Sequence, residues 1–285
     1  MMKDLKDKVV VVTGAASGIG REMAKAFAER GARLALADID LEGLRAIREE
    51  LEAAGRAVYS QEVDVADADR MEDFCACVYR EMGRVDVLCN NAGVALGGCL
   101  EHLTLEDWRW IVGINLMGVI HGCHFFYPRM IEQGGGGHIV NTASLAGLVP
   151  SVGLLAYTTT KFAVVGFSEA LRPEAARHGI GVTVICPSFV LTGISRNARI
   201  RSIREGESLE EGIKKSEEIL GKRKYTARSV AEETVKAVEK NRGVVRICPE
   251  AYIMDYLYRL SRALFGSINT HILRPGRNTQ PNAGG

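Results

Sequence analysis

The strongest constraint on the fold comes from residues 9–30, where four successive valines lead into a glycine-rich turn and then into a helical pattern. A strand that is apolar at every position needs cover on both of its faces. The turn, TGAASGIG at residues 13–20, places its glycines where the chain would leave the strand and enter a helix at residues 19–30. We therefore expect a parallel sheet with helices packed on both sides.

The rest of the chain repeats this alternation of strand and helix. Further apolar, β-branched runs predict strands at residues 34–37, 57–63, 85–88, 139–140, 182–185 and 244–247. Helical periodicity predicts helices at residues 41–54, 68–82, 105–131, 155–178 and 229–240. With the segments above, these elements predict an α/β fold: a Rossmann-type, doubly wound parallel sheet of about seven strands in a single domain. That domain is expected to span residues 1–274.

The pattern changes in the C-terminal third. Residues 192–223 are charged and lack strand character, so they are expected to form a mobile substrate loop with one or two short helices. The basic residues of this segment are interpreted as a solvated helix face. They are Arg196, Arg199, Arg201 and Arg204. An apolar helix at residues 252–265 is expected to pack over the substrate pocket or against a neighbouring subunit, rather than on a membrane surface. Residues 275–285 are expected to be a disordered tail.

Composition argues against several classes of function. The net charge of +1 provides no field that would attract nucleic acid. No apolar stretch reaches the ~18 residues of a membrane span, and the charged start, MMKDLKDKVV, does not resemble a secretory signal. Seven scattered cysteines without a CxxC pair favour a reducing cytoplasm. His121 and His124 have no third ligand at a suitable spacing, so no metal site is expected.

The glycine-rich turn predicts a dinucleotide site. Glycines let the main chain approach a pyrophosphate, and a helix N-terminus presents free N–H groups to it. The residues concerned are Gly14, Ser17, Gly18, Ile19 and Gly20. Asp38, at the end of the second strand, can accept both hydroxyls of an adenosine ribose and would repel a 2′-phosphate. Asp40 is the better candidate for the N-cap of the next helix. Because no Lys or Arg lies in the turn or directly after Asp38, NAD is favoured over NADP.

A second group of residues predicts acid–base chemistry. Tyr157 and Lys161 stand four residues apart on one helix face, where the ammonium would favour the phenolate and lower the tyrosine pKa. Ser144 lies thirteen residues before Tyr157, after the fifth strand, where its hydroxyl can hold a substrate oxygen. Asn115 is a polar residue among apolar helix neighbours. Taken singly, these residues are also compatible with a surface Tyr–Lys pair and a satisfied core asparagine.

Together these motifs resemble those of the classical short-chain dehydrogenase/reductase family. The resemblance runs from about residue 8 to about residue 193. It rests on TGAASGIG at 13–20, the acid at 38, Asp64-Val65, NNAG at 90–93, Asn115, Ser144, YTTTK at 157–161, and Pro187 followed by Thr192-Gly193. The family usually has a glycine after the proline. This chain has Ser188 there, a departure that bears on the conformation of the turn.

The resemblance implies a role for each matching residue. Tyr157 would be the general acid/base, Ser144 its partner on the substrate oxygen, and Lys161 the group that binds the nicotinamide ribose. Asn115 would hold a water in a proton path to solvent. The remaining cofactor contacts would be Asp64 and Val65 at the adenine, Asn91 and Gly93 beside the ribose, and Pro187, Val190 and Thr192 at the nicotinamide.

The sequence thus predicts an NAD-dependent oxidoreductase that interconverts a secondary alcohol and a ketone by hydride transfer. We expect a homo-oligomer, a tetramer or a dimer, and a hydrophobic or steroid-like substrate because the C-terminal region is apolar. Two alternatives remain. One is an NADPH-dependent carbonyl reductase of a biosynthetic pathway, which Asp38 disfavours. The other is a non-catalytic dinucleotide-binding scaffold, which the complete set of Asn115, Ser144, Tyr157 and Lys161 disfavours.

Overall fold

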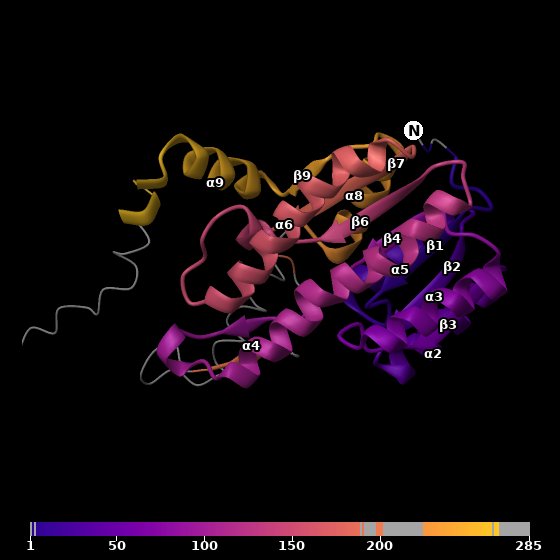
Figure 1. Ribbon diagram of the computed structural model, residues 1–285, viewed down its shortest axis with the longest axis horizontal. Helices are drawn as coiled ribbons and strands as arrows, with labels where there is room; N and C mark the ends of the chain where they lie inside the picture. Colours follow the sequence, from indigo (N-terminus) through magenta and orange to yellow (C-terminus); the bar gives the residue numbers. More distant parts are fainter. Residues whose placement is uncertain are drawn as a thin grey trace, which may run out of the picture.

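Seven parallel strands form the central sheet in the order β3-β2-β1-β4-β6-β7-β9 (Figure 1). The strands are β1 (Val9–Thr13), β2 (Arg33–Asp38), β3 (Val58–Glu62), β4 (Val87–Asn90), β6 (Gly137–Thr142), β7 (Ile180–Pro187) and β9 (Val244–Ile247). They belong to a computed structural model that describes residues 2, 4–188, 190, 198–201, 225–263 and 265–267. β1 pairs with β2 on one side and with β4 on the other, so the strand order reverses there. The doubly wound, single-domain topology is confirmed, and its switch point is where such sheets bind ligands.

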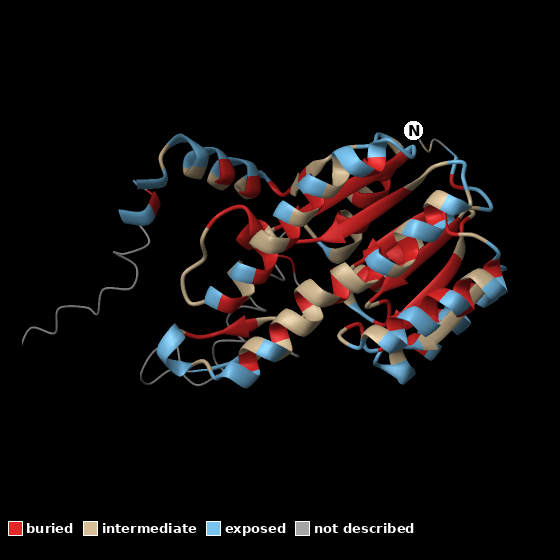
Figure 2. Ribbon diagram, in the orientation of Figure 1, coloured by how far each residue is buried: buried red, intermediate tan, exposed pale blue. Residues whose placement is uncertain are grey.

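Helices cover both faces of the sheet, and the buried residues lie in the strands and on the helix faces that meet them (Figure 2). On one face lie α1 (Gly18–Glu29), α2 (Leu41–Ala53) and α8 (Ala227–Glu239). On the other lie α3 (Ala68–Met82), α5 (Gly118–Glu132) and α6 (Leu155–Ala176). Along β1, Val10 and Val12 belong to the first core and Val9 and Val11 to the second. The four-valine run is buried on both sides, as its composition requires.

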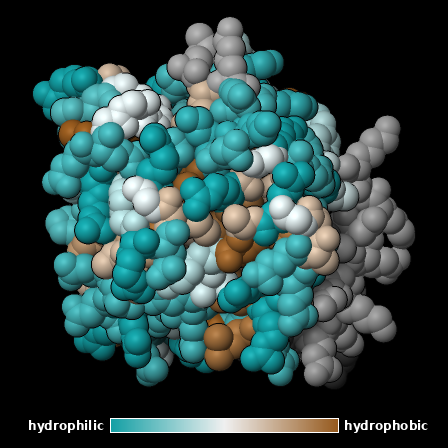
Figure 3. Space-filling view, turned by 90° about the vertical axis from the view of Figure 1, so that its right-hand side faces the viewer, coloured by the Kyte–Doolittle hydropathy of each residue, from teal (hydrophilic) through white to brown (hydrophobic). Residues whose placement is uncertain are grey.

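The sheet ends on one side at β3, which is mostly half-buried because it has a neighbouring strand on one side only. The molecular surface on this side of the protein is mostly hydrophilic, with small scattered apolar areas (Figure 3). An edge strand that carries polar side chains offers a poor template for pairing with another sheet.

One long helical run, Leu105–Glu132, carries a local change of winding. It consists of α4 (Leu105–Val112), a π-helical turn (Gly113–Met117) and α5. Contrary to the expectation from the sequence, this run is long and apolar enough to cross a membrane, by length and composition alone. Such a pattern is also that of a core helix, and Val119, Phe126 and Met130 are indeed buried in the core on the α3 side of the sheet.

A second sheet of two short strands lies beside the main one, and no sequence pattern predicts it. β5 (Leu96–Gly97) pairs in parallel with β8 (Arg199–Ile200). Next to β8, Arg201 donates to both carboxylate oxygens of the buried Asp107 on α4, at 2.6 and 3.0 Å. The Arg199 guanidinium lies 4.0 Å from the centroid of the Trp110 ring, also on α4.

The interpretation of the basic run as a solvated helix face is therefore wrong for Arg199 and Arg201. A buried carboxylate and an indole ring hold them at a strand instead. The other residues of the predicted substrate loop, 192–197 and 202–223, lie outside the described residues. The predicted tail at 275–285 does so too.

Helix α9 (Pro249–Leu260) begins three residues before the predicted position, and a non-helical residue, Ser261, separates it from the helical residues 262–263 and 265–267. Pro249 is in its first turn, where the missing N–H of proline removes no helical hydrogen bond. The buried Asp255 attaches α9 to β9 by accepting from Arg246 Nε at 2.6 Å.

The outer face of α9 is exposed (Figure 2), although the sequence predicts that this apolar helix packs over the substrate pocket or against a neighbouring subunit. Its exposed apolar residues are Tyr252, Ile253, Tyr256, Leu257 and Leu260. Among the described residues, none from α9 lines the cleft at the carboxyl ends of the strands.

We expect the buried His138 to make stability fall as the pH falls below about 6.5. Burial lowers the pKa of its imidazole to about 3, and its Nε2 lies 2.7 Å from Thr183 Oγ1. Between these pH values the unfolded chain binds a proton that the native chain does not. The unfolding free energy should therefore drop by up to about 1.4 kcal/mol for each pH unit through this group. Urea titrations between pH 7 and 5 measure it. His138→Gln should remove that part of the slope, whereas the same change at the exposed His102 should not.

Candidate active site

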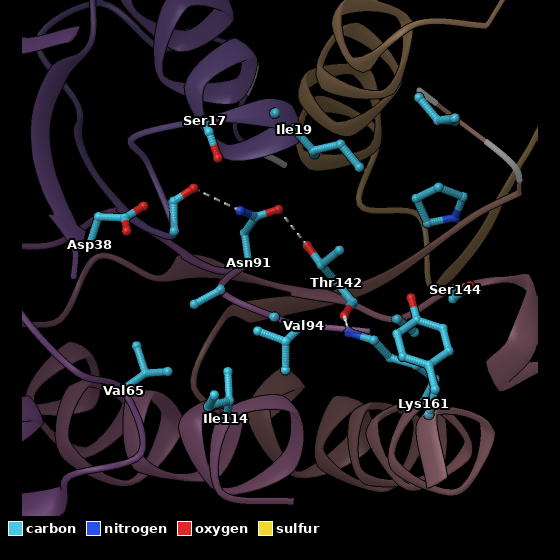
Figure 4. A pocket seen from close by; sticks show the side chains of 18 of the residues that line it. Ser17, Ile19, Asp38, Val65, Asn91, Val94, Ile114, Thr142, Ser144 and Lys161 are labelled. Carbon is cyan, nitrogen blue, oxygen red and sulfur yellow. Dashed lines mark hydrogen bonds between the residues drawn. The ribbon is translucent and has the colours of Figure 1, made fainter. Parts of the chain in front are cut away.

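A cleft opens at the carboxyl ends of β1, β4, β6 and β7 (Figure 4). It brings together almost every residue that the sequence analysis assigns to the cofactor or to catalysis. The exceptions are Gly20 and Asn115, which do not line it, and Thr192, which lies outside the described residues. Residues from widely separated segments thus meet at the switch point of the sheet.

The turn between β1 and α1 is shaped for close approach of a ligand. Gly14 and Gly18 have φ values of +65° and +53°, which other residues rarely adopt. A Cβ on Gly14 would lie 2.8 Å from Ala92 Cα, and one on Gly20 would lie 2.0 Å from the Gly14 carbonyl oxygen. A side chain at position 20 would clash with the turn, so Gly20 is required for the conformation of the turn although it does not line the cleft. Ser17, the N-cap of α1, forms no side-chain capping hydrogen bond, which leaves N–H groups of the first turn available to a ligand.

Asp38 lies at the end of the cleft beside this turn (Figure 4). One carboxylate oxygen accepts from the Ala16 N–H at 2.9 Å and the other from the Asp40 N–H at 3.0 Å. These contacts fix its orientation and leave lone pairs for further donors. Asp40 caps α2 by accepting from the Gly43 N–H, as predicted. Lys161 is the only basic side chain among the described residues that line the cleft.

The predicted adenine contacts, Asp64 and Val65, line the same part of the cleft. Asp64 Oδ1 accepts from the Ala66 N–H at 2.9 Å, which shapes the turn. The Val65 carbonyl oxygen lies 2.9 Å from His121 Nδ1 on α5. A Cβ on Gly118 would lie 2.7 Å from Val65 Cγ2, so a glycine lets α5 support this wall directly. His121 thus has a structural partner in the cleft wall.

Ser144 and Lys161 lie at the other end of the cleft from Asp38 (Figure 4). Tyr157 is next to both, since its phenol hydrogen bonds with Ser144 and its ring faces Lys161. The Lys161 Nζ is 5.6 Å from the centroid of the Tyr157 ring. Burial raises the pKa of the Tyr157 phenol, and a hydrogen bond with Ser144 offsets part of this effect. Burial also lowers the pKa of the Lys161 ammonium to about 8. The expected lowering of the tyrosine pKa by Lys161 is therefore wrong for this structure, because desolvation dominates.

A chain of hydrogen bonds connects the glycine turn to Lys161 (Figure 4). The Asn91 amide donates to the Gly14 carbonyl oxygen at 3.3 Å and to the Thr13 carbonyl oxygen at 3.0 Å. Its own oxygen accepts from Thr142 Oγ1 at 3.3 Å. The Thr142 carbonyl oxygen then accepts from Lys161 Nζ at 2.9 Å. One residue of the NNAG motif therefore links the two functional ends of the cleft.

Asn115 lies in the π-helical turn and is fully buried. Its side-chain oxygen accepts from the Val94 N–H at 2.8 Å, and its amide nitrogen donates to the Val94 carbonyl oxygen at 2.9 Å and to Thr160 Oγ1 at 3.3 Å. The side chain is thus engaged by protein groups, as the alternative of a satisfied core asparagine requires. It ties the segment after NNAG to the helix that carries Tyr157.

Pro187, Ser188 and Val190, at and after the end of β7, also line the cleft. The Ser188 N–H donates to the Ile247 carbonyl oxygen at 3.3 Å, and among the described non-glycine residues Ser188 is not one with a positive φ. The serine therefore fits this turn without the backbone freedom of the glycine that is usual in the family.

Two functional residues escape sequence reasoning. Thr13 accepts from the N–H groups of Asn91 and Ala92 at 3.0 and 3.1 Å, and Thr142 links Asn91 to Lys161. Each ends a strand that leads into the cleft, and Thr13 is also the first residue of the TGAASGIG motif, although no role was assigned to it. Apolar lining residues such as Ile39 and Val94 directly follow predicted ones, so adjacency is a usable signal.

A group of possible metal ligands lies outside the cleft. Cys99, Glu101 and His102 bring donor atoms within 4.8 Å of one another at a short 3₁₀ turn. Glu101 and His102 are exposed, and none of the three lines the cleft.

Comparison with known proteins agrees with this geometry. The family model for short chain dehydrogenases matches residues 8–202. The probable oxidoreductase EphD of Mycobacterium tuberculosis is 38% identical over 259 residues, which are 90% of this chain and 43% of EphD. The chain thus spans less than half the length of that relative.

Two solved structures share the fold. A short chain dehydrogenase/reductase from Burkholderia phymatum in complex with NAD is 33% identical, with a TM-score of 0.84 over 92% of this chain and 96% of that one. A variant of actinorhodin polyketide ketoreductase with NADPH is 32% identical, with a TM-score of 0.76 over 86% of this chain and 97% of the other.

Proposed function

Because the chain belongs to the short chain dehydrogenase family of oxidoreductases, we propose that it is an NAD-dependent enzyme that interconverts a secondary alcohol and a ketone. The observation that carries the proposal is the single cleft that holds Asp38 at one end and Ser144, Tyr157 and Lys161 at the other. An acid at the adenosine end and a proton donor at the reacting end are what a nicotinamide-dependent alcohol oxidation needs.

The residues of the cleft fit such a cofactor. Free N–H groups at the start of α1 suit the pyrophosphate, and Asp38 suits the two ribose hydroxyls. Gly93 keeps the space beside Lys161 open, since a Cβ there would lie 3.4 Å from Nζ. When bound, nicotinamide supplies the hydride acceptor or donor.

The side chains of the protein then handle the proton and the substrate oxygen. Tyr157 takes the hydroxyl proton during oxidation and returns it to the carbonyl oxygen during reduction. Ser144, which hydrogen bonds the phenol, holds the same substrate oxygen. Lys161, whose ammonium is held in place by the Thr142 carbonyl oxygen, binds the nicotinamide ribose. Asn115 holds the helix that carries Tyr157 against the segment that follows NNAG. A water bound there in a proton path to solvent is implied by the family resemblance alone.

A panel of secondary alcohols and ketones tests the activity, followed by the absorbance of the reduced nicotinamide. We expect at least one pair to be interconverted with NAD. If the protein binds NADH but turns over no member of a panel that includes hydrophobic and steroid alcohols, the scaffold alternative replaces the proposal.

We expect a preference for NAD over NADP of at least about a hundredfold in kcat/KM. The Asp38 carboxylate would face the 2′-phosphate, and like charges in such a site cost on the order of several kcal/mol. No other basic group among the described lining residues would offset this, because Lys161 lies at the far end. Asp38→Ala should lower the ratio of kcat/KM for NAD to that for NADP. Asp40→Ala removes the N-cap of α2, so it should lower the free energy of unfolding and leave this ratio unchanged. Equal use of NADP by the unmodified protein would contradict the assignment.

The substrate, assembly and location follow as further parts of the proposal. An apolar cluster that includes Val94, Leu96 and Trp110 together with Tyr157 supports a hydrophobic alcohol or ketone. The exposed apolar face of α9 supports a homo-oligomer, a dimer or tetramer. None of the seven cysteines, all of which are among the described residues, forms a disulfide, which supports a reducing, cytoplasmic setting.

A further inference from the structure

The 3₁₀ turn at Leu100–His102 brings three possible metal ligands together outside the cleft. They are the Cys99 thiol, the Glu101 carboxylate and the His102 imidazole, whose donor atoms all lie within 4.8 Å of one another. Among the described residues this is the only such group of three or more His, Cys, Asp or Glu side chains. Cys99 is half-buried and the other two are exposed, so an ion can reach them from solvent. The proposed function uses none of the three.

The main chain holds these ligands in position. The His102 N–H donates to the Cys99 carbonyl oxygen at 2.9 Å. Residues three apart in a 3₁₀ turn lie on the same side of it, which brings the side chains of Cys99 and His102 together. Just before the turn, the Gly98 N–H donates to the Gly153 carbonyl oxygen at 2.8 Å. The main chain is therefore fixed, and only side-chain torsions need to change when an ion binds.

The three side chains can close on an ion without losing other contacts. Within the described part of the chain, no hydrogen bond or ion pair occupies any of them. Tetrahedral zinc has bonds of about 2.0–2.3 Å to oxygen, nitrogen and sulfur ligands, so its ligand atoms lie about 3.3–3.8 Å apart. The donor atoms must therefore approach one another by roughly 1 Å, which rotation of side chains at an exposed turn allows.

We propose that Cys99, Glu101 and His102 bind a Zn²⁺ ion, with water in the fourth position. Thiolate and imidazole ligands suit zinc, whereas Mg²⁺ and Ca²⁺ prefer oxygen ligands alone. The thiol releases its proton to solvent when the ion binds. Three protein ligands leave one position of the ion open to solvent, unlike the four ligands of a closed structural site.

The turn that carries the ligands lies next to the catalytic helix. Gly98, at its start, forms a β-bridge with Leu154, the N-cap of α6. Leu103, at its end, packs in the apolar cluster that contains Tyr157. An ion that binds only the folded turn stabilises the native protein, so the unfolding temperature should rise with the zinc concentration.

Metal titrations test the site without cofactor or substrate. Metal-free protein is titrated with Zn²⁺ in competition with a chromophoric chelator, and separately with Co²⁺ as a spectroscopic probe. We expect one equivalent of Zn²⁺ to bind and to raise the unfolding temperature. Bound Co²⁺ should show a thiolate-to-metal charge-transfer band. A large excess of Mg²⁺ should not displace the zinc.

Three variants assign the binding to the turn. Cys99→Ala and His102→Gln should each weaken Zn²⁺ binding at least about tenfold, since even groups that only support a ligand contribute about 10–100-fold to metal affinity. Cys99→Ala should also abolish the charge-transfer band. His124→Gln is the matched control, because His124 is an exposed histidine on α5 outside the group, and it should leave the affinity unchanged. Thermal unfolding of each metal-free variant checks that the fold is intact.

Two results overturn the inference. One is the absence of stoichiometric zinc binding by the unmodified protein. The other is a zinc affinity that Cys99→Ala and His102→Gln leave unchanged, which would place the ion elsewhere. Either result leaves the proposed function intact, because none of these residues lines the cleft.

Discussion

Replacement of Tyr157 with phenylalanine is expected to lower turnover by about 10²–10⁴-fold, which is the usual contribution of a positioned general acid/base. The change removes one oxygen and keeps the ring, so the apolar contacts of Tyr157 with its neighbours survive. Folding and NADH affinity should therefore stay close to those of the unmodified protein. The measurements are kcat on the alcohol that the panel identifies, NADH titration by fluorescence, and thermal unfolding.

Tyr127→Phe is a matched control, since Tyr127 lies on α5 outside the cleft, with its ring against His178. It should leave turnover unchanged. If Tyr157→Phe binds NADH normally and still turns over at the unmodified rate, the catalytic assignment is wrong. If it also fails to bind NADH, the phenol has a structural role that the geometry does not indicate.

Lys161→Met is expected to weaken NADH binding about tenfold or more, because the ammonium is assigned to the nicotinamide ribose. It should also lower turnover by at least about a hundredfold, because a ring that is no longer held at its ribose is misplaced for hydride transfer. Burial also predicts a pH dependence. The pKa of Lys161 is lowered to about 8, so the side chain carries its charge below that pH and loses it above. NADH affinity of the unmodified protein should therefore fall as the pH rises through about 8. Lys161→Met should show no such step.

Lys161→Arg provides the contrast, because a guanidinium stays charged throughout this range. It should bind NADH without a step near pH 8, although with altered strength. A step of the same size in Lys161→Met would assign the titration to another group. A pH-independent affinity in the unmodified protein would show that the charge of Lys161 does not contribute to binding.

The sheet was predictable because its signals are local. The four valines of β1, the NNAG segment after β4 and the helical periodicities each lie within a few residues of the element that they predict. The same holds for the glycine turn and for the Tyr157–Lys161 pair. A parallel sheet then brings its strand ends to one edge, so residues predicted separately, such as Asp38 and Ser144, line one cleft.

Contacts between distant segments could not be predicted in this way. Arg201 meets Asp107, ninety-four residues away in sequence, and this pair holds a strand of only two residues that no periodicity reveals. Thr142 contributes its main-chain carbonyl to Lys161, and every residue type has that group. The raised pKa of Tyr157 likewise depends on how deeply the ring is buried, which the spacing to Lys161 does not reveal.

The hydrogen-bond chain from Gly14 through Asn91 and Thr142 to Lys161 has a consequence for conformational entropy. A free lysine side chain loses up to about 2 kcal/mol of rotamer entropy when it becomes fixed. Here the ammonium is already held by a main-chain carbonyl at the end of a central strand, so this loss belongs to folding and not to cofactor binding. Every cofactor molecule that enters then meets a lysine already in place, and the ordering cost does not recur with each catalytic cycle.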